Sequence, residues 1–321
     1  MLNLAKLRWM IAPLFCMGAA LADTYPNQAL RMIMPFAPGT ASENAMKIIL
    51  EKLQENLKVF ILLDNKPGAG STLGTDMAAK APADGYTLVA SYNSSISPGT
   101  LLYNKLPYDA LKDFKHIALI GVFPQYMVVK GDYGVKNIQE FLALVKSKPG
   151  ALNYSSAGVG TSGFLAVELL KQTLNLDLVH VPYKGTGPAM TDLLGGRLDM
   201  VMTSSAASLV ASGKIRVLAV SSDQRNPNYP ETPTLSEISP RVHAVSWMGI
   251  SAPAQTPAAV VQKLEKEILG VLNQPDIKTK LSEPSLGMTL TPLGSEKFLE
   301  FIQNETNKWR PVIKAGNFQI N

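Results

Sequence analysis

The sequence predicts an α/β fold of two lobes, and three observations support this prediction. Apolar strand-like runs alternate with segments of helical periodicity, a pattern typical of parallel sheets covered by helices. Two extended runs, residues 120–125 and 245–252, read as strands that cross from one lobe to the other. A loop rich in small residues joins a strand to a helix once in each proposed lobe, at residues 35–43 and 154–164.

The strand-like runs and the helical segments follow one another along the chain. The expected strands are residues 30–36, 59–64, 86–91, 115–122, 126–130, 178–183, 198–203, 215–221 and 245–251. The expected helices are residues 42–56, 72–80, 137–146, 162–173, 188–194, 256–272 and 295–313.

Two of the helix starts carry a proline signal. Thr256-Pro257 reads as a cap followed by proline in the first turn, and Gly187-Pro188 repeats this logic. In the helix that follows Thr256, one face is apolar and is expected to lie in the core; it consists of Val260, Leu264, Ile268 and Val271.

Composition indicates an ordinary folded protein that is long enough for two domains. Of 321 residues, 46% are hydrophobic and 17% are charged, which is too mixed for disorder. The net charge of +5 comes from scattered basic residues, so we expect no nucleic-acid partner. Mild basicity suits an anionic small ligand.

The first 22 residues are typical of a secretory signal peptide. A basic start precedes an apolar run over residues 9–21, and residues 20–22 (ALA) supply the small side chains that cleavage requires. We expect cleavage after Ala22 and export to the periplasm. Cys16 is the only cysteine, and the bulky residues before it argue against a lipid anchor. The mature chain therefore has no thiol for a disulfide, a nucleophile or a metal ligand.

The two extended runs divide the mature chain into two lobes. We expect residues 23–122 and 246–321 to form lobe 1 and residues 123–245 to form lobe 2. One lobe then comes from both chain ends and the other from the middle, which is the arrangement of a two-lobed clamp.

Each small-residue loop leads into the N-terminus of a helix. Unpaired backbone N–H groups and the positive end of the helix dipole attract anions there, and small side chains let an anion approach. Two such loops facing each other would hold a carboxylate without an arginine. In the first loop, Thr40 to Glu43 (TASE) also match a capping box, so a structural role for Glu43 and a ligand contact both stay open.

The second loop also matches a dinucleotide-binding pattern. Residues 158–163 (GVGTSG) fit G-x-G-x-x-G between a strand and a helix. However, Asp177 lies at the start of the next strand instead of its end, and an exported protein rarely meets NAD. We therefore expect no dinucleotide and no other cofactor.

Signs of catalytic chemistry are sparse in the sequence. The three histidines are far apart with no metal-ligand spacing, so we expect no metal site and no enzyme activity. Serines follow two of the expected strands, namely Ser94 and Ser95 and, later, Ser204 and Ser205. They either cap loops or hydrogen-bond a ligand, and both alternatives stay open.

Successive segments resemble those of the Bug (Bordetella uptake gene) family of periplasmic solute-binding proteins, the extracytoplasmic subunits of tripartite tricarboxylate transporters. The matching segments, in order over essentially the whole mature chain, are PFAPGTASE, NKPGAGSTLG, ADGYTL, NKLPYDALKDF, YSSAGVGTSG, HVPYKGTGPAMTDLLGGRLD, GKIRVLAVSS, PETPTLSE and WMGISAPAQTP.

The resemblance implies a type II-like Venus flytrap fold with two strand crossovers. It implies a monomer that binds a mono- or dicarboxylate and delivers it to membrane permease subunits; the alternative is a sensor subunit for a membrane signalling partner. Together with the serines that follow strands, it gives these expected ligand-binding residues: Phe36, Ala37, Pro38, Gly39, Thr40, Ala41, Ser42, Ser94, Ser95, Ser156, Ala157, Gly158, Val159, Gly160, Thr161, Ser162 and Ser204.

The chain departs from the family pattern near both loops. Gly39-Thr40 stands where the family usually has two glycines, Glu43 where it has aspartate, and Phe164 where it often has histidine. An apolar Phe164 favours a ligand whose far end is less polar than that of citrate or aspartate.

Overall fold

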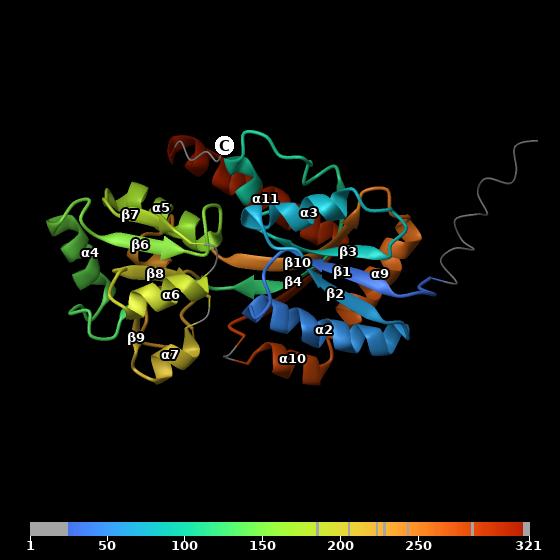
Figure 1. Ribbon diagram of the computed structural model, residues 1–321, viewed down its shortest axis with the longest axis horizontal. Coiled ribbons are helices and arrows are strands. Elements are labelled where there is room, and N and C mark those ends of the chain that lie inside the picture. The colour runs from blue at the N-terminus through green and yellow to red at the C-terminus, as the bar shows by residue number, and fades with distance from the viewer. Residues whose placement is uncertain are drawn as a thin grey trace, which may run out of the picture.

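Two lobes, each built around one sheet, make up the molecule (Figure 1). The computed structural model describes residues 25–183, 186–204, 206–222, 224–226, 229–242, 244–283 and 286–316. The expected signal peptide, residues 1–22, lies outside the described residues.

The first lobe contains a six-stranded mixed sheet in the order β11-β4-β10-β3-β1-β2. Its strands are β1 (Leu30–Met34), β2 (Ile61–Asn65), β3 (Thr87–Tyr92), β4 (Phe114–Phe123), β10 (Ser246–Pro253) and β11 (Thr289–Gly294). β1 pairs in parallel with β2 and β3, whereas β10 is antiparallel to β3 and β4. The sheet is mixed and not parallel throughout, because β4 leaves this lobe and β10 re-enters it, so these two neighbours run in opposite directions.

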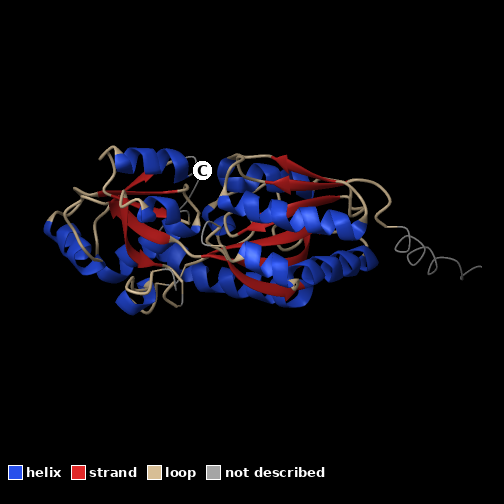
Figure 2. Ribbon diagram, turned by 90° about the horizontal axis from the view of Figure 1, so that it is seen from below, coloured by secondary structure: helices blue, strands red, loops and turns tan. Residues whose placement is uncertain are grey.

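Helices cover both faces of this sheet (Figures 1 and 2). They are α2 (Ala41–Leu57), α3 (Thr72–Ala79), α9 (Ala258–Leu272), α10 (Pro275–Leu281) and α11 (Ser295–Gly316), with short 3-10 turns η2 (Ala69–Ser71) and η3 (Gly99–Leu102). α2, α9 and α10 pack together on one face.

The apolar face of α9 is buried as predicted, but the residue that caps the start of this helix differs from the predicted one. Val260, Leu264, Ile268 and Val271 are all buried. The N-cap is Pro257 and not Thr256, whose buried hydroxyl has no hydrogen-bond partner in the described structure. The predicted cap at Thr256 was therefore wrong by one residue. Pro257 has an extended ψ of 139°, so it lies outside the helix, and the helix begins only at Ala258.

The second lobe contains a five-stranded mixed sheet in the order β7-β6-β8-β5-β9. Its strands are β5 (Tyr126–Lys130), β6 (Asn153–Ser156), β7 (Val179–Pro182), β8 (Met200–Thr203) and β9 (Ile215–Val220). Its helices are α4 (Ile138–Ser147), α5 (Ser162–Leu174), α6 (Thr186–Leu194), α7 (Ala207–Ala211) and α8 (Leu235–Ile238).

The two chain crossings between the lobes lie side by side. β4 ends at Phe123 and β5 of the other sheet begins at Tyr126, while Ser246 at the start of β10 pairs with Phe123. Gln125 is tied to the second lobe by hydrogen bonds in both directions: its N–H donates to Ser221 Oγ, and its carbonyl accepts from the Ser221 N–H, each at 2.8 Å. The lobe boundaries at residues 122/123 and 245/246 stay a prediction.

The C-terminal helix α11 contributes to both lobes. Phe298 and Ile302 pack in the first lobe with Trp247. Trp309 and Ile313, further along the same helix, are buried among residues of the second lobe. Figure 1 shows α11 running across the junction. This helix links the lobes in addition to the two crossing strands.

Candidate ligand-binding site

The first loop, residues 36–42, leads from β1 into α2, and its helix start is occupied from within the chain. Thr40 is the N-cap, and its Oγ1 accepts the Glu43 N–H at 3.1 Å. The Gly39 N–H donates to Glu43 Oε2 in turn. Because Glu43 is only 2% exposed and holds these contacts, the structural role for this residue is the one that the geometry supports.

The charge of Glu43 is stabilised at this helix start. Burial opposes its ionisation, but hydrogen bonds from Lys47 and from the Gly39 amide outweigh burial, so that the pKa of Glu43 lies below its usual range. Lys47 Nζ lies 2.9 Å from Glu43 Oε1. A carboxylate of the protein therefore already sits at the positive end of α2.

The second loop, residues 156–162, leads from β6 into α5, and its helix start is open. Thr161 is the N-cap, but its side chain makes no capping bond and instead donates to the Gly158 carbonyl at 2.7 Å. In the described parts of the chain, the backbone N–H groups of Ser162 and Gly163 have no acceptor. α5 therefore presents free donors at its positive end.

This open helix start faces the first lobe. A Cβ at Gly160 would lie 3.0 Å from Leu102 Cδ1, and one at Gly70 would lie 3.9 Å from the Val159 carbonyl oxygen. Gly160 has a φ of +83° and Gly158 a φ of +135°, conformations that glycine adopts without strain. The loop therefore needs its glycines both for backbone shape and for close approach to the opposite lobe.

The half-buried His180 lies behind the loop and supports it. His180 Nε2 lies 3.2 Å from Ser156 Oγ, which also accepts the Gly158 N–H at 3.3 Å. Burial lowers the pKa of His180 to about 4, so the ring is neutral near pH 7. Behind the ring, Tyr154 donates to Glu168 at 2.6 Å.

The predicted serines lie in different surroundings. Ser94 is 4% exposed and its Oγ lies 2.6 Å from Ser71 Oγ. Ser95 is completely buried, and its hydroxyl has no hydrogen-bond partner in the described structure. Ser204, at the end of β8, lines a cavity between the lobes. Ser205 lies outside the described residues.

The sequence reasoning missed Ser71 as a neighbour of the site. Ser71 precedes α3 and bonds Ser94, while Gly70 before it faces the second loop. A signal was present in residues 68–72 (GAGST), which again lead through small residues into a helix, as the two recognised loops do.

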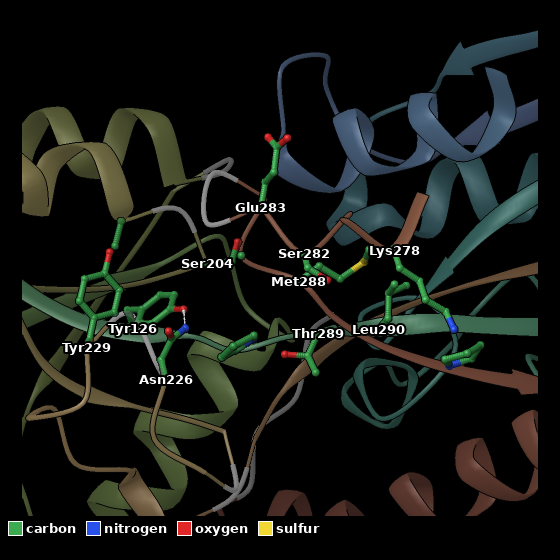
Figure 3. Close-up of a pocket in the computed structure, with 14 residues that line it drawn as sticks. Tyr126, Ser204, Asn226, Tyr229, Lys278, Ser282, Glu283, Met288, Thr289 and Leu290 are labelled. Atoms are coloured by element: carbon green, nitrogen blue, oxygen red, sulfur yellow. Dashed lines mark hydrogen bonds between the residues drawn. The ribbon is translucent and has the colours of Figure 1, made fainter. Parts of the chain in front are cut away.

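The cavity that Ser204 lines has a volume of about 760 Å³ and lies between the two lobes (Figure 3). The second lobe contributes Tyr126, Asn226 and Tyr229 to its wall, and the first lobe contributes Lys278, Glu283 and residues 287–290. Apart from Ser204, none of the predicted ligand-binding residues lines it. Tyr126 and Tyr229 gave no sequence signal, because each is a single aromatic residue that only the folded chain brings to the other.

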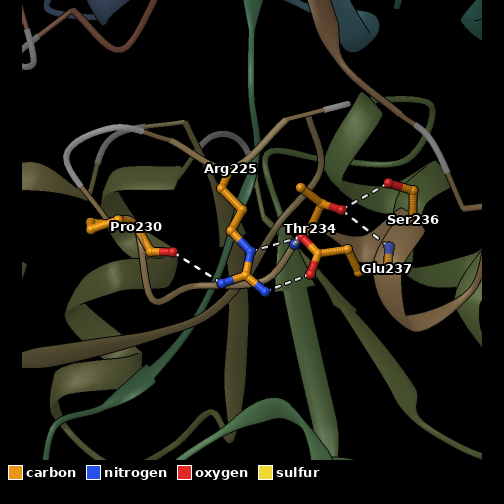
Figure 4. Close-up of polar contacts among 5 residues, drawn as sticks. All are labelled: Arg225, Pro230, Thr234, Ser236 and Glu237. Atoms are coloured by element: carbon orange, nitrogen blue, oxygen red, sulfur yellow. Dashed lines mark hydrogen bonds and ion pairs between the residues drawn. The ribbon is translucent and has the colours of Figure 1, made fainter.

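An ion pair holds the loop that carries Asn226 and Tyr229 (Figure 4). Arg225 Nε and Nη2 donate to the two carboxylate oxygens of Glu237 at 2.9 and 2.6 Å, and Arg225 Nη1 donates to the Pro230 carbonyl at 3.1 Å. Glu237 also closes a capping box with Thr234 at the start of α8. The guanidinium thus fixes both ends of this loop.

The described part of the chain shows neither a metal-binding cluster nor a membrane-spanning helix. The described residues contain no group of three or more His, Cys, Asp or Glu side chains that could hold a metal ion. Among the helices that the structure describes, none combines the length and the apolar character needed to cross a membrane.

A family model and several curated relatives match this chain. Residues 45–318 match the model of the tripartite tricarboxylate transporter family receptor. The chain is 34% identical to the UPF0065 protein in the tcbD-tcbE intergenic region of Pseudomonas sp., over 93% of this chain and 89% of that protein. It is 30% identical to BugT of Bordetella pertussis, over 93% and 92% of the two chains.

Several solved structures have a similar fold. The periplasmic binding protein BugD superposes with a TM-score of 0.83 at 29% identity, covering 92% of this chain and 99% of BugD. An adipate-bound protein of R. palustris has a TM-score of 0.85 at 26% identity, over 91% and 98% of the chains. MatC from Rhodopseudomonas palustris, with bound malate, has a TM-score of 0.80 at 28% identity, over 90% and 100%.

Proposed function

The chain belongs to the tripartite tricarboxylate transporter receptor family, and from this premise we propose that it captures a small organic carboxylate between its lobes. The ligand carboxylate binds at the second loop, where it accepts hydrogen bonds from the backbone N–H groups of Ser162 and Gly163. The protein then delivers its ligand to the permease subunits of a tripartite transporter. It acts by binding and release, without chemistry on the ligand.

The open start of α5 is the observation that carries this proposal. Thr161 leaves the helix uncapped, so an anion that binds there satisfies donors that otherwise lack a partner. Charge-assisted hydrogen bonds of this kind are the strong ones among protein hydrogen bonds. Glu43 already fills the equivalent position at α2, so we place the first loop in a secondary role, with Ala41 and Ser42 as its available donors.

The two ligand-bound neighbours support the choice of ligand class. Malate is bound to MatC and adipate to the other R. palustris protein, and both ligands are carboxylates. Export to the periplasm through cleavage after Ala22, action as a monomer and the absence of a cofactor are parts of the same proposal.

A thermal-shift screen of the mature protein tests the proposal. Organic acids should raise the melting temperature, because a ligand at 100 times its dissociation constant adds about 2.7 kcal/mol to the free energy of unfolding. Sugars, cationic amino acids and nucleotides should leave it unchanged. If a sugar stabilises the protein while a broad panel of organic acids does not, the ligand class is wrong.

A further inference from the structure

The cavity between the lobes lies beside the second loop along one edge of the second sheet. β6, β8 and β5 are consecutive neighbours in that sheet. β6 ends at Ser156, β8 ends at Thr203, and Tyr126 at the start of β5 pairs with Thr203. Neighbouring strands lie about 4.8 Å apart, so the cavity wall at Tyr126 begins roughly two strand spacings from the loop.

Two tyrosines form a fixed aromatic wall on the side of the second lobe (Figure 3). The rings of Tyr126 and Tyr229 are 5.7 Å apart, edge to face. The hydroxyl of Tyr126 accepts a hydrogen bond from Asn226 Nδ2 at 2.6 Å. Tyr126 is 4% exposed, so it backs Tyr229, which is half-buried and offers its ring to the cavity.

The facing wall belongs to the first lobe and mixes apolar side chains with the polar side chains of Ser282 and Thr289. Met288 and Leu290 line it at the start of β11, and Pro292 follows them. The two charged side chains that line the cavity, Lys278 and Glu283, have opposite charges, so they give no net attraction for a second carboxylate. A volume of about 760 Å³ is in the range of sites that hold drug-sized ligands, roughly 300–1,000 Å³.

From this geometry we infer that the cavity is the site for the body of the ligand, and that this body is an aromatic ring. The ligand is then an aromatic monocarboxylate, with its carboxylate at the start of α5 and its ring between Tyr229 and the wall formed by Met288 and Leu290. This inference rests on the proposed function and adds the substrate class to it. Residues from both lobes enclose the ring, so its burial favours the closed arrangement.

Calorimetric titration with phenylacetate, benzoate, succinate and adipate tests the inference. The parent protein should bind the two aromatic acids at least about tenfold more tightly than succinate, because ring contacts add to the burial of apolar area. Tyr229→Ala should weaken phenylacetate binding about tenfold or more and should change succinate binding by less than about twofold.

Two further variants separate the ring contact from other effects. Tyr229→Phe keeps the ring and should retain the affinity for phenylacetate. Tyr86→Ala is the matched control, because Tyr86 is also half-buried and packs edge to face on another tyrosine, Tyr25, but lies before β3 at the strand end away from the loops. It should leave all four affinities unchanged. A melting curve of each ligand-free variant shows that it is folded.

The outcomes distinguish this inference from the proposed function. If succinate and adipate bind as well as the aromatic acids, or if Tyr229→Ala leaves phenylacetate affinity within about twofold of the parent, the aromatic site is wrong and carboxylate capture stands. If none of the four acids binds to the parent and a broad acid panel also fails, both ideas are overturned.

Discussion

Ser162, at the start of α5, donates a hydrogen bond from its Oγ to the carbonyl of Val245 at 3.0 Å. Val245 immediately precedes β10, one of the two strands that cross between the lobes. The open helix start is therefore attached directly to a crossing strand. We therefore expect a change in the crossing to move the proposed carboxylate site, and a carboxylate bound there to shift the crossing in turn.

Ligand should accordingly close the two lobes as rigid bodies. We expect the motion to be concentrated in residues 121–124 and 246–251, where the chain crosses between the two lobes. Small-angle scattering should give a smaller radius of gyration with a saturating organic acid than without one. An unchanged radius at confirmed saturation would mean that the pocket is closed beforehand.

Gly160→Val should weaken ligand binding strongly. The residue has a φ of +83°, which a branched side chain disfavours, and the new side chain would occupy the gap toward Leu102. Charge-assisted hydrogen bonds are each worth about 1.5–3 kcal/mol, so loss of one should lower the affinity at least about tenfold, and loss of two bonds of about 2 kcal/mol each should lower it about a thousandfold. Calorimetry beside a melting curve of the ligand-free variant measures it. A stable variant that binds as tightly as the parent would show that this loop does not hold the ligand.

Thr40→Ala and Thr161→Ala form a matched pair, since each removes the hydroxyl of an N-cap residue. Thr40 caps its helix and Thr161 does not. Thr40→Ala should lower the free energy of unfolding by about 1 kcal/mol. Thr161→Ala should lower it less, because only the bond to Gly158 is lost. Urea unfolding of both variants tests this, and equal losses would contradict the assignment of α5 as uncapped.

The buried His116 should make stability depend on pH. Burial lowers its pKa to about 4, from 6.5, so between these values the unfolded chain binds more protons than the folded chain. The free energy of unfolding therefore falls as the pH drops from about 6.5 to about 4, by as much as about 3 kcal/mol for this one group.

His116→Asn should reduce this pH dependence. Urea unfolding of parent and variant near pH 7 and near pH 4.5 gives the difference for each protein. His180 titrates in the same direction and contributes equally to both, so it cancels in the comparison. Should parent and variant lose the same stability on acidification, His116 is not the responsible group.

The sequence by itself located most of the elements and the two loops, although it gave no expectation for α10 or β11. Hydrophobic periodicity depends on residues close together in the chain, so it located helices such as α2 and α5 to within a few residues of their bounds. The two-lobed fold and the family were predicted from ordered segments along most of the chain. They are confirmed by the family match over residues 45–318 and by the similarity to the BugD structure.

Only the tertiary structure decided how the elements meet. Whether a helix start is capped depends on where a side chain turns, and Thr40 and Thr161 look alike in the sequence although only the first caps its helix. The antiparallel pairing of β4 with β10, the bridging by α11 and the contact of Tyr126 with Tyr229 all join residues that are distant in sequence. Such contacts form when the chain buries apolar surface as a whole, and no local pattern encodes them.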